Sequence, residues 1–158
     1  MTDIKTIFRK HHGYARMRDM KLAGVHTRDI ASACADSVIE KIKPGLYKLV
    51  DYPWDEHSSF SDIHAAFPNA VICLVSASEY YGLITYNPTE VSVAVAHNGF
   101  KFTLVYPPIK VYFFTEKFYD TGIATVKSKS GNFKIYTVEK TIVDLFRYRK
   151  KIGDDIVL

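Results

Sequence analysis

Three side chains suited to acid–base chemistry, Glu139, Lys140 and Asp144, lie close together near the end of the chain. The surrounding pattern is helical, so Lys140 and Asp144 stand one turn apart, a spacing that favours an ion pair. Thr137 is suited to cap such a helix, and Glu139 would then lie in its first turn, where the helix dipole favours a negative charge. We therefore expect these residues to stabilise a helix rather than to catalyse a reaction.

Other catalytic patterns are incomplete. A restriction-type nuclease needs Glu-x-Lys with an upstream Asp, but Glu116-Lys117 and Glu139-Lys140 both lack the spacer. The sequence has no Gly-Ser followed by paired carboxylates, as a nucleotidyltransferase requires, and no phosphate-binding glycine loop. Ser76 lacks the Gly-x-Ser-x-Gly setting, and the adjacent His11 and His12 point to different faces of a helix. We predict that the protein is not an enzyme and has no catalytic residues, cofactor or metal.

The composition is that of a globular protein without a membrane span. Of 158 residues, 47% are hydrophobic and 24% are charged. The longest apolar run, residues 70–75, is far shorter than the ~20 residues that span a bilayer, and the N-terminus resembles no secretory signal. Two isolated cysteines, Cys34 and Cys73, form no disulfide framework or zinc motif. These features predict a cytoplasmic protein with reduced thiols.

The basic charge is concentrated at the start of the chain. Residues 1–50 contain ten Lys and Arg against five Asp and Glu, whereas the remainder contains eleven against twelve. A basic segment attached to a near-neutral one indicates a nucleic-acid partner, although a basic surface without a ligand remains an alternative.

The hydrophobic pattern changes near residue 50, and it predicts an α+β protein in three parts. We expect a winged helix-turn-helix at 1–50, a polar linker at 51–60 and a mixed α/β domain with a largely antiparallel sheet at 61–158. The predicted elements of this last part are helices at 62–67 and 138–150 and strands at 71–75, 90–96, 100–106, 110–114, 123–129 and 132–137.

Two short helices joined by a glycine are predicted between residues 16 and 35. Gly24 ends the first helix, and Thr27 or His26 caps the second. Met20, Val25 and Ile30 recur at the spacing of an inward face. This layout is typical of a helix-turn-helix.

A hairpin around Pro44-Gly45 follows, because this pair is the signature of a type II turn. In a winged helix, side chains of the second helix approach bases and cations of the hairpin contact phosphates. Alternatives are an edge strand charged against aggregation and a winged helix used only for protein contact. The predicted DNA-binding residues are Arg16, Arg18, His26, Thr27, Arg28, Ser32, Lys41, Lys43 and Lys48. Of these, Thr27, Arg28 and Ser32 are expected to approach bases, and the phosphate contacts are assigned to Arg16, Arg18, Lys41, Lys43 and Lys48.

A second basic patch is possible in the C-terminal domain. Strand cations and helix-end cations would extend the DNA footprint, although solubility and helix-end electrostatics explain them equally well. These residues are Lys127, Lys129, Lys134, Arg147, Arg149 and Lys150.

The sequence resembles the AbiEi-type antitoxins of bacterial toxin–antitoxin systems over nearly its whole length. The most specific stretch is Glu139-Lys140-Thr141-Ile142-Val143-Asp144, and residues 19–25, 42–47 and 76–83 are also similar. The resemblance implies a repressor that binds inverted repeats of double-stranded DNA in its own promoter. It also implies an antitoxin, active in abortive infection and phage defence, that counters a nucleotidyltransferase-like toxin without requiring direct contact. Members of the family usually continue with further helices beyond the point where this sequence stops, Leu158.

Two other functions remain open from the sequence. In the first, the winged helix is vestigial and the β-rich domain binds and regulates a partner protein without specific DNA binding. In the second, a nuclease-like C-terminal domain is directed to DNA by the winged helix.

Overall fold

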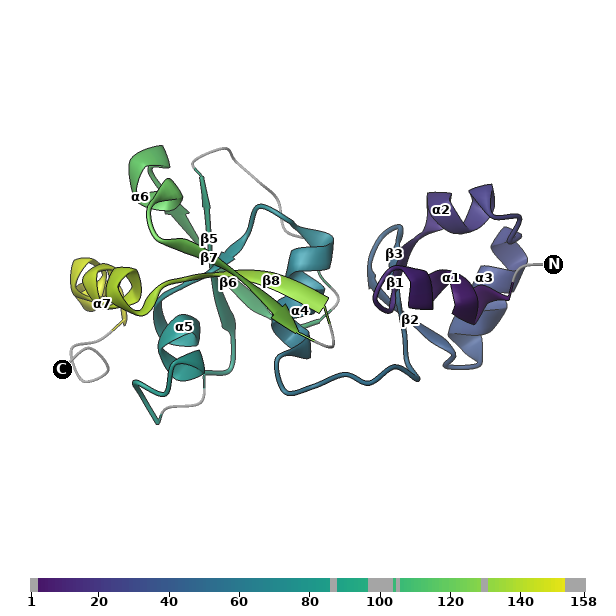
Figure 1. The fold of residues 1–158 in the computed structure, drawn as a ribbon, viewed down its shortest axis with the longest axis horizontal. Helices are drawn as coiled ribbons and strands as arrows, with labels where there is room; N and C mark the ends of the chain where they lie inside the picture. The colour runs from purple at the N-terminus through teal and green to yellow at the C-terminus, as the bar shows by residue number, and fades with distance from the viewer. Residues whose placement is uncertain (1–2, 86–87, 97–103, 105, 129–130, 153–158) are drawn as a thin grey trace.

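The chain folds as a mixed α+β protein with two sheets that together are largely antiparallel. The computed structural model describes residues 3–85, 88–96, 104, 106–128 and 131–152. Figure 1 shows that each half of the chain contains its own sheet and that an extended segment joins the two halves. We call residues 3–50 the N-terminal module and residues 58–152 the C-terminal part.

The N-terminal module packs three helices on a three-stranded antiparallel sheet of order β1-β3-β2. Its core contains Phe8, Met20, Ile30 and Leu49, which are all buried. Its elements are α1 (Ile4–Lys10), β1 (Tyr14–Arg16), α2 (Met17–Leu22), α3 (Thr27–Ala35), β2 (Ile39–Lys43) and β3 (Leu46–Leu49).

Two glycine predictions in this module are confirmed. Gly24 follows α2 with a φ of +94°, the left-handed conformation that ends a helix. Gly45 has a φ of +83° between β2 and β3, as a type II turn requires at its third position. The N-cap of α3 is His26, and Thr27 is already the first helical residue.

The C-terminal part is built around a five-stranded sheet of order β6-β5-β4-β8-β7. The pairs β4/β5 and β7/β8 are antiparallel, while β4/β8 and β5/β6 are parallel, so this sheet is mixed. The elements are α4 (Ser58–Ala66), β4 (Val71–Ile72), α5 (Leu74–Tyr80), β5 (Val91–Ala96), β6 (Ile109–Phe114), α6 (Glu116–Asp120), β7 (Ile123–Ser128), β8 (Gly131–Tyr136), α7 (Val138–Arg147) and α8 (Arg149–Ile152).

Successive strand residues enter different clusters, as the alternation of a strand requires. Ile72 and Ile135 pack with Phe60 and Ile63 of α4 on one side. Val71, Ala94 and Tyr136 pack on the other side with Leu145 of α7. The sheet therefore lies between two layers of helix, and α7 covers the face opposite α4.

Several predicted boundaries differ from the structure. A strand is predicted at 71–75, but the observed strand β4 contains only Val71 and Ile72. Leu74 has a φ of +49° and begins the buried helix α5. An apolar run of this kind fits a strand or a buried helix equally well. Helix α4 begins at Ser58, inside the predicted linker, and the helix predicted at 138–150 is interrupted at Tyr148. The strand predicted at 100–106 lies outside the described residues, except for 104 and 106, which are not in a strand.

Candidate nucleic-acid interface

Helix α3 presents a polar face to solvent and an apolar face to the core of the N-terminal module. Ile30 and Ala33 are buried against Met20, while Thr27, Arg28 and Ser32 are exposed. The small residues Ala31 and Ala35 are exposed as well, so few bulky side chains cover the outer face of the helix. A face of this kind admits close approach to a flat or grooved surface, with Arg28 and Thr27 at its N-terminal end.

The turn before α3 is held by the same core. The amide of Val25 donates to the carbonyl of Met20 at 3.0 Å, and Val25 packs against the buried cluster. The predicted inward positions Met20, Val25 and Ile30 are therefore brought together. His26, the remaining predicted residue of this region, is exposed beside Thr27.

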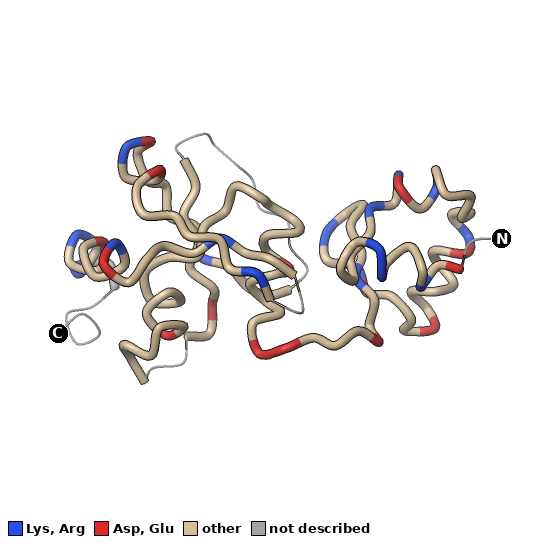
Figure 2. The backbone as a smooth tube through the Cα atoms, in the orientation of Figure 1, with Lys and Arg blue, Asp and Glu red and all other residues tan. Residues whose placement is uncertain are grey.

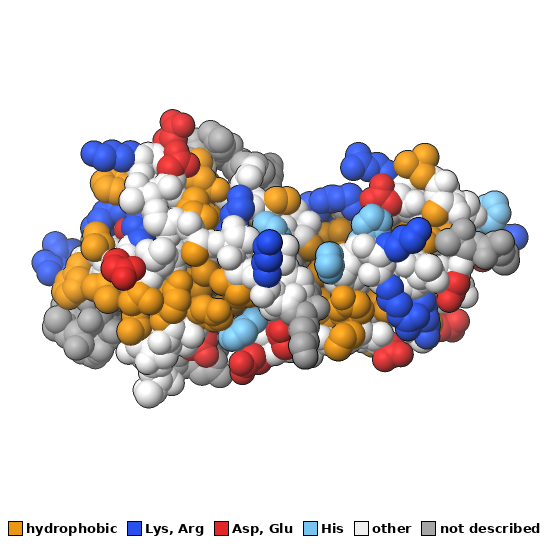
Figure 3. All heavy atoms as spheres, viewed as in Figure 1, with side chains coloured by type: hydrophobic (Ala, Val, Ile, Leu, Met, Phe, Trp, Pro, Cys, Tyr) orange, Lys and Arg blue, Asp and Glu red, His pale blue; other side chains and the backbone are white. Residues whose placement is uncertain are grey.

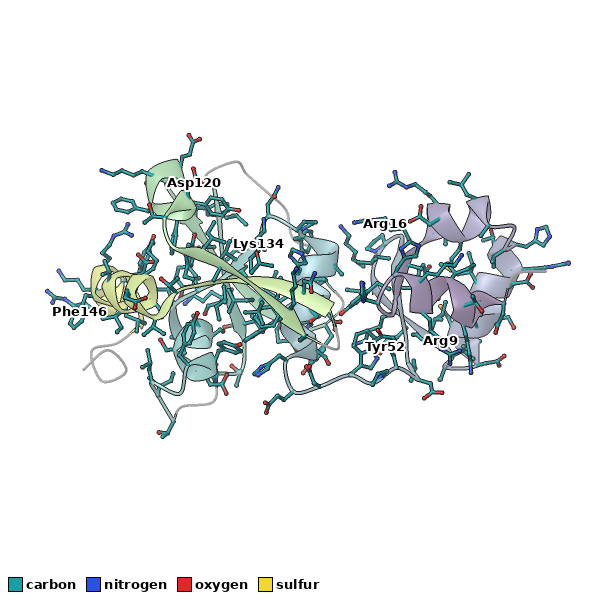
Figure 4. The ribbon with its side chains drawn as sticks, in the orientation of Figure 1. Arg9, Arg16, Tyr52, Asp120, Lys134 and Phe146 are labelled. Carbon is teal, nitrogen blue, oxygen red and sulfur yellow. The ribbon has the colours of Figure 1, made fainter. Side chains whose placement is uncertain are left out.

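Three predicted phosphate ligands have another partner in the structure. The Nζ of Lys43 donates to the carbonyl of Ala66 at 2.8 Å, and Arg16 donates to the carbonyl of Ala65 at 3.4 Å. Both acceptors belong to the last turn of α4, where helix carbonyls lack helical partners and the dipole favours cations. Figure 4 shows Arg16 on the side of the N-terminal module that faces the C-terminal part.

The third cation, Lys48, forms an ion pair with α4. Its Nζ lies 2.9 Å from Oδ2 of Asp62, and the hydroxyl of Tyr14 donates to Oδ1 of Asp62 at 2.5 Å. Burial, with the Asp62 charge and hydrogen bond, holds the pKa of Tyr14 well above its usual value. We call the contacts of Tyr14, Arg16, Lys43 and Lys48 with α4 the α4 clamp.

Apolar packing surrounds the α4 clamp. Tyr14, Ile42 and Leu46 of the N-terminal module form a buried cluster with Ala66 of α4. The ammonium of Lys43 lies 4.5 Å from the ring centre of Phe67. Burial, and secondarily the charge of Arg16, lowers the pKa of Lys43. The hairpin between β2 and β3 thus attaches the N-terminal module to the C-terminal part.

The other two predicted phosphate ligands are exposed. Arg18 is on α2, with its Nε 3.8 Å from the carboxylate of Asp19, and Lys41 is on β2. Figures 2 and 3 show that Lys and Arg are spread over the N-terminal module together with Asp and Glu. The acids include Asp29 and Asp36, so the surface of α3 is mixed rather than uniformly basic.

The predicted second basic patch is divided. Lys127 on β7 is exposed and Lys134 on β8 is half-buried, whereas Arg147, Arg149 and Lys150 follow one another at the end of α7 and in α8. Figure 4 shows Lys134 over the sheet and Phe146, the neighbour of Arg147, at the far end of the molecule. The structure therefore does not join the two groups, and Lys129 lies outside the described residues.

Two of the acid–base candidates, Lys140 and Asp144, form a buried ion pair that Arg147 joins. Lys140 donates to Oδ2 of Asp144, and Arg147 donates to Oδ1 of Asp144 at 2.9 Å. Both carboxylate oxygens therefore have partners, and the predicted Lys140–Asp144 pair is confirmed. Thr137 caps α7 by accepting from the amide of Lys140 at 3.4 Å, and Glu139 lies in the first turn, both as predicted.

A cavity of about 410 Å³ lies between α6 and α7. Its walls are largely apolar and include Phe118 and Val143, with the polar atoms of Lys140 and Asp144 engaged with each other. The serine considered above, Ser76, is buried and accepts from the amide of Ser92 at 2.8 Å.

Sequence reasoning missed Tyr14 and Asp62. Asp62 carried a usable signal, because it is an acid within the short apolar helix pattern of Phe60 and Ile63. A buried charge needs a partner. The sequence does not identify the partners of Asp62, because Lys48 lies 14 residues and Tyr14 lies 48 residues away along the chain.

No protein-family model matches the chain, and no curated protein matches it.

Within the described residues, no helix combines the length and apolar character needed to cross a bilayer. In that same part of the chain, His, Cys, Asp and Glu residues form no group of three or more that could hold a metal ion.

Proposed function

We propose that this protein is a DNA-binding transcription regulator whose N-terminal module is a winged helix. The observation that carries the proposal is the exposed face of α3. Thr27, Arg28 and Ser32 lie on it among small residues, and Ile30 is buried behind it. A helix with this surface fits the major groove, where arginine recognises guanine and serine or threonine contacts bases or phosphates.

The order of the elements supports this proposal. Helix α1 is followed by β1, the helix pair α2 and α3, and the β2–β3 hairpin, and this succession is typical of winged helices. Because Arg16, Lys43 and Lys48 belong to the α4 clamp, we assign phosphate contacts to the exposed cations Arg18 and Lys41. Helix α3 then makes most of the DNA contact, and the hairpin tip attaches the N-terminal module to α4.

The biological setting of the proposal rests on the AbiEi resemblance. We propose that the regulator binds inverted repeats in its own promoter, and that it acts as the antitoxin of a nucleotidyltransferase-like toxin. The exposed apolar residues of α7 (Ile142, Val143 and Phe146) favour the protein-binding alternative for the C-terminal part.

Fluorescence anisotropy with DNA from upstream of the protein's own gene tests DNA binding. We expect salt-sensitive binding that is tighter than to a scrambled duplex. Arg28→Ala should weaken binding at least about fivefold, since a good base contact contributes about 1–3 kcal/mol. The matched variant Lys43→Ala should stay within about twofold of the wild type, because the Lys43 amine contacts α4.

The opposite result for these two variants would place the hairpin tip on DNA and contradict the assignment to α3. Equal, weak binding to both duplexes would contradict DNA recognition altogether. Coexpression with the product of the neighbouring gene tests the antitoxin role. Growth restored by this protein supports that role, and unrelieved toxicity contradicts it.

A further inference from the structure

Helix α7 has an inverted distribution of polarity. The side facing the rest of the C-terminal part carries Lys140 and Asp144, which are buried together with Leu145. The side facing solvent carries Ile142, Val143 and Phe146, which are 42%, 57% and 47% exposed. A surface helix normally has the reverse arrangement. Three large apolar side chains on one exposed helical face indicate a surface that another molecule covers.

The orientation of α7 is fixed by its buried side. Lys140 and Arg147 both bond to Asp144, and the ammonium of Lys140 also lies 4.7 Å from the ring centre of Tyr136. Rotation of the helix to bury its apolar side would break these contacts. It would also leave the charges of Lys140 and Asp144 without new partners. Among the described residues nothing covers this apolar side, so a cover has to come from outside them.

Charged residues of opposite sign flank this apolar side. Glu139 is exposed at the N-terminal end, one helical turn before Ile142. Arg149 and Lys150 are exposed beyond the other end, at the start of α8. Tyr148 ends α7 with a φ of −104° and a ψ of 10°, outside the helical range, and the short helix α8 begins at the next residue. We call Glu139, Ile142, Val143, Phe146 and Arg149 the α7 stripe.

The α7 stripe is complementary to itself when reversed. We propose that two copies of this chain pack antiparallel through the α7 stripe, so that Glu139 of each faces Arg149 of its partner. The same register places Ile142 opposite the partner's Phe146 and brings Val143 close to the two-fold axis. Such a two-fold contact uses one patch twice, and every apolar and charged position then has a counterpart.

The neighbouring surface offers room for the partner. The cavity between α6 and α7 is bounded by Glu139 and Val143 of the α7 stripe and by Phe118 of α6. An apolar side chain from the second copy would occupy part of it. Figure 3 shows hydrophobic side chains gathered at the end of the molecule where α7 lies, and Figure 4 shows Phe146 at that end, opposite the N-terminal module.

The charge pattern favours a second copy over a membrane. A helix that lies on anionic lipid carries cations along its polar margin, whereas here one end of the apolar surface carries Glu139. Two short helices bury less than the 1,200–2,000 Å² or so of a standard interface, so we expect a weak dimer. The contact goes beyond the proposed function, and it would leave the two N-terminal modules at opposite ends of the assembly.

Sedimentation of the full chain without DNA tests the dimer over a range of concentrations. The wild type should shift from one-chain to two-chain mass as concentration rises. Glu139→Arg or Arg149→Glu alone should weaken association at least about tenfold, because each creates two like-charge contacts. The double variant Glu139→Arg with Arg149→Glu should restore it. Restoration also shows that each substituted side chain is compatible with folding.

A cysteine at the axis gives a second readout. In a Cys34→Ser background, Val143→Cys should form a disulfide-linked dimer under mild oxidation, whereas Leu22→Cys, exposed on α2, should not. A wild type that stays monomeric, equal cross-linking at both positions, or a double variant no better than the single ones would overturn the proposal. None of these outcomes depends on DNA binding.

Discussion

The ammonium of Lys48 in β3 lies 2.9 Å from a carboxylate oxygen of Asp62 in α4, and the side chain of Asp62 is only 4% exposed. The other oxygen of Asp62 accepts from the hydroxyl of Tyr14. One acid of the C-terminal part thus fixes two strands of the N-terminal module. The basic surface expected from the sequence is correspondingly smaller in the structure.

Replacement of Asp62 should destabilise the protein strongly. Asp62→Ala leaves the half-buried ammonium of Lys48 without its counter-charge and the buried hydroxyl of Tyr14 without its acceptor. Removal of one partner of a buried ion pair costs about 3–5 kcal/mol, and we expect about 3 kcal/mol in urea unfolding because Lys48 is not fully buried. Asp19→Ala, at the exposed pair with Arg18, should cost under about 1 kcal/mol. Equal losses in the two variants would contradict this role for Asp62.

Two glycines with similar backbone angles should respond differently to alanine. Gly13 and Gly24 have φ values of +91° and +94°, so both variants carry the strain of about 1–2 kcal/mol of a left-handed residue. At Gly13 a Cβ would also lie 2.8 Å from the ring of Trp54, whereas at Gly24 nothing lies within 4 Å. Overpacking adds about 1–3 kcal/mol, so Gly13→Ala should unfold at lower urea than Gly24→Ala. Identical urea midpoints for the two variants would show that the Trp54 side chain moves aside without loss of stability.

His64 should make stability depend on pH. Burial, and secondarily the charge of Lys134, lowers the pKa of His64, and within the described residues its Nδ1 has no hydrogen-bond partner. The unfolded chain therefore binds a proton at a higher pH than the folded protein. Stability is complete above the unfolded pKa of about 6.5 and falls as the pH drops from there toward the folded pKa.

Unfolding measured at neutral and mildly acidic pH checks this dependence. His64→Leu should lose less stability on acidification than the wild type, because leucine binds no proton. His11→Gln, at an exposed position, should keep the wild-type dependence. A His64→Leu variant that retains the wild-type slope would assign the pH dependence to other groups.

The ion-pair network of α7 should contribute to stability as a unit. Asp144→Leu leaves the buried ammonium of Lys140 unpaired and should cost about 4 kcal/mol. Adding Lys140→Met should recover part of that loss, because an apolar pair tolerates burial better than a lone charge. Glu139→Gln, at an exposed position, should change stability by less than about 0.5 kcal/mol. Additive losses from the two buried substitutions would contradict the network.

The turns of the N-terminal module were predictable because their signals are local. Gly24 and Pro44-Gly45 dictate backbone angles within a few residues, and Ile30 follows the periodicity of its own helix. The direction of the hairpin was not predictable in this way. A strand lysine has the same sequence signature whether it meets a phosphate or the last carbonyls of α4. For Lys43 that acceptor lies 23 residues away, beyond the extended segment.

The C-terminal sheet was predicted strand by strand but not in its pairing. Alternating residues located β5 to β8 within a residue or two, whereas Val71 and Ile72 were merged with the helix that follows them. The parallel pairing of Ile72 with Ile135 joins residues that no local pattern relates. The outward apolar residues of α7 were likewise hidden, because periodicity shows that a helix has two faces and not which one is buried.

The central position of β4 determines the order in which the two parts of this protein can fold during translation. The sheet of the N-terminal module is complete once Leu49 has emerged, since its strands pair only with one another. Strand β4 emerges soon afterwards, but one of its two neighbours is β8, which ends at Tyr136. The C-terminal part must therefore wait for most of the chain to be translated, with the apolar edge of β4 open meanwhile. Nascent chains would carry a finished first half well before the second half closes.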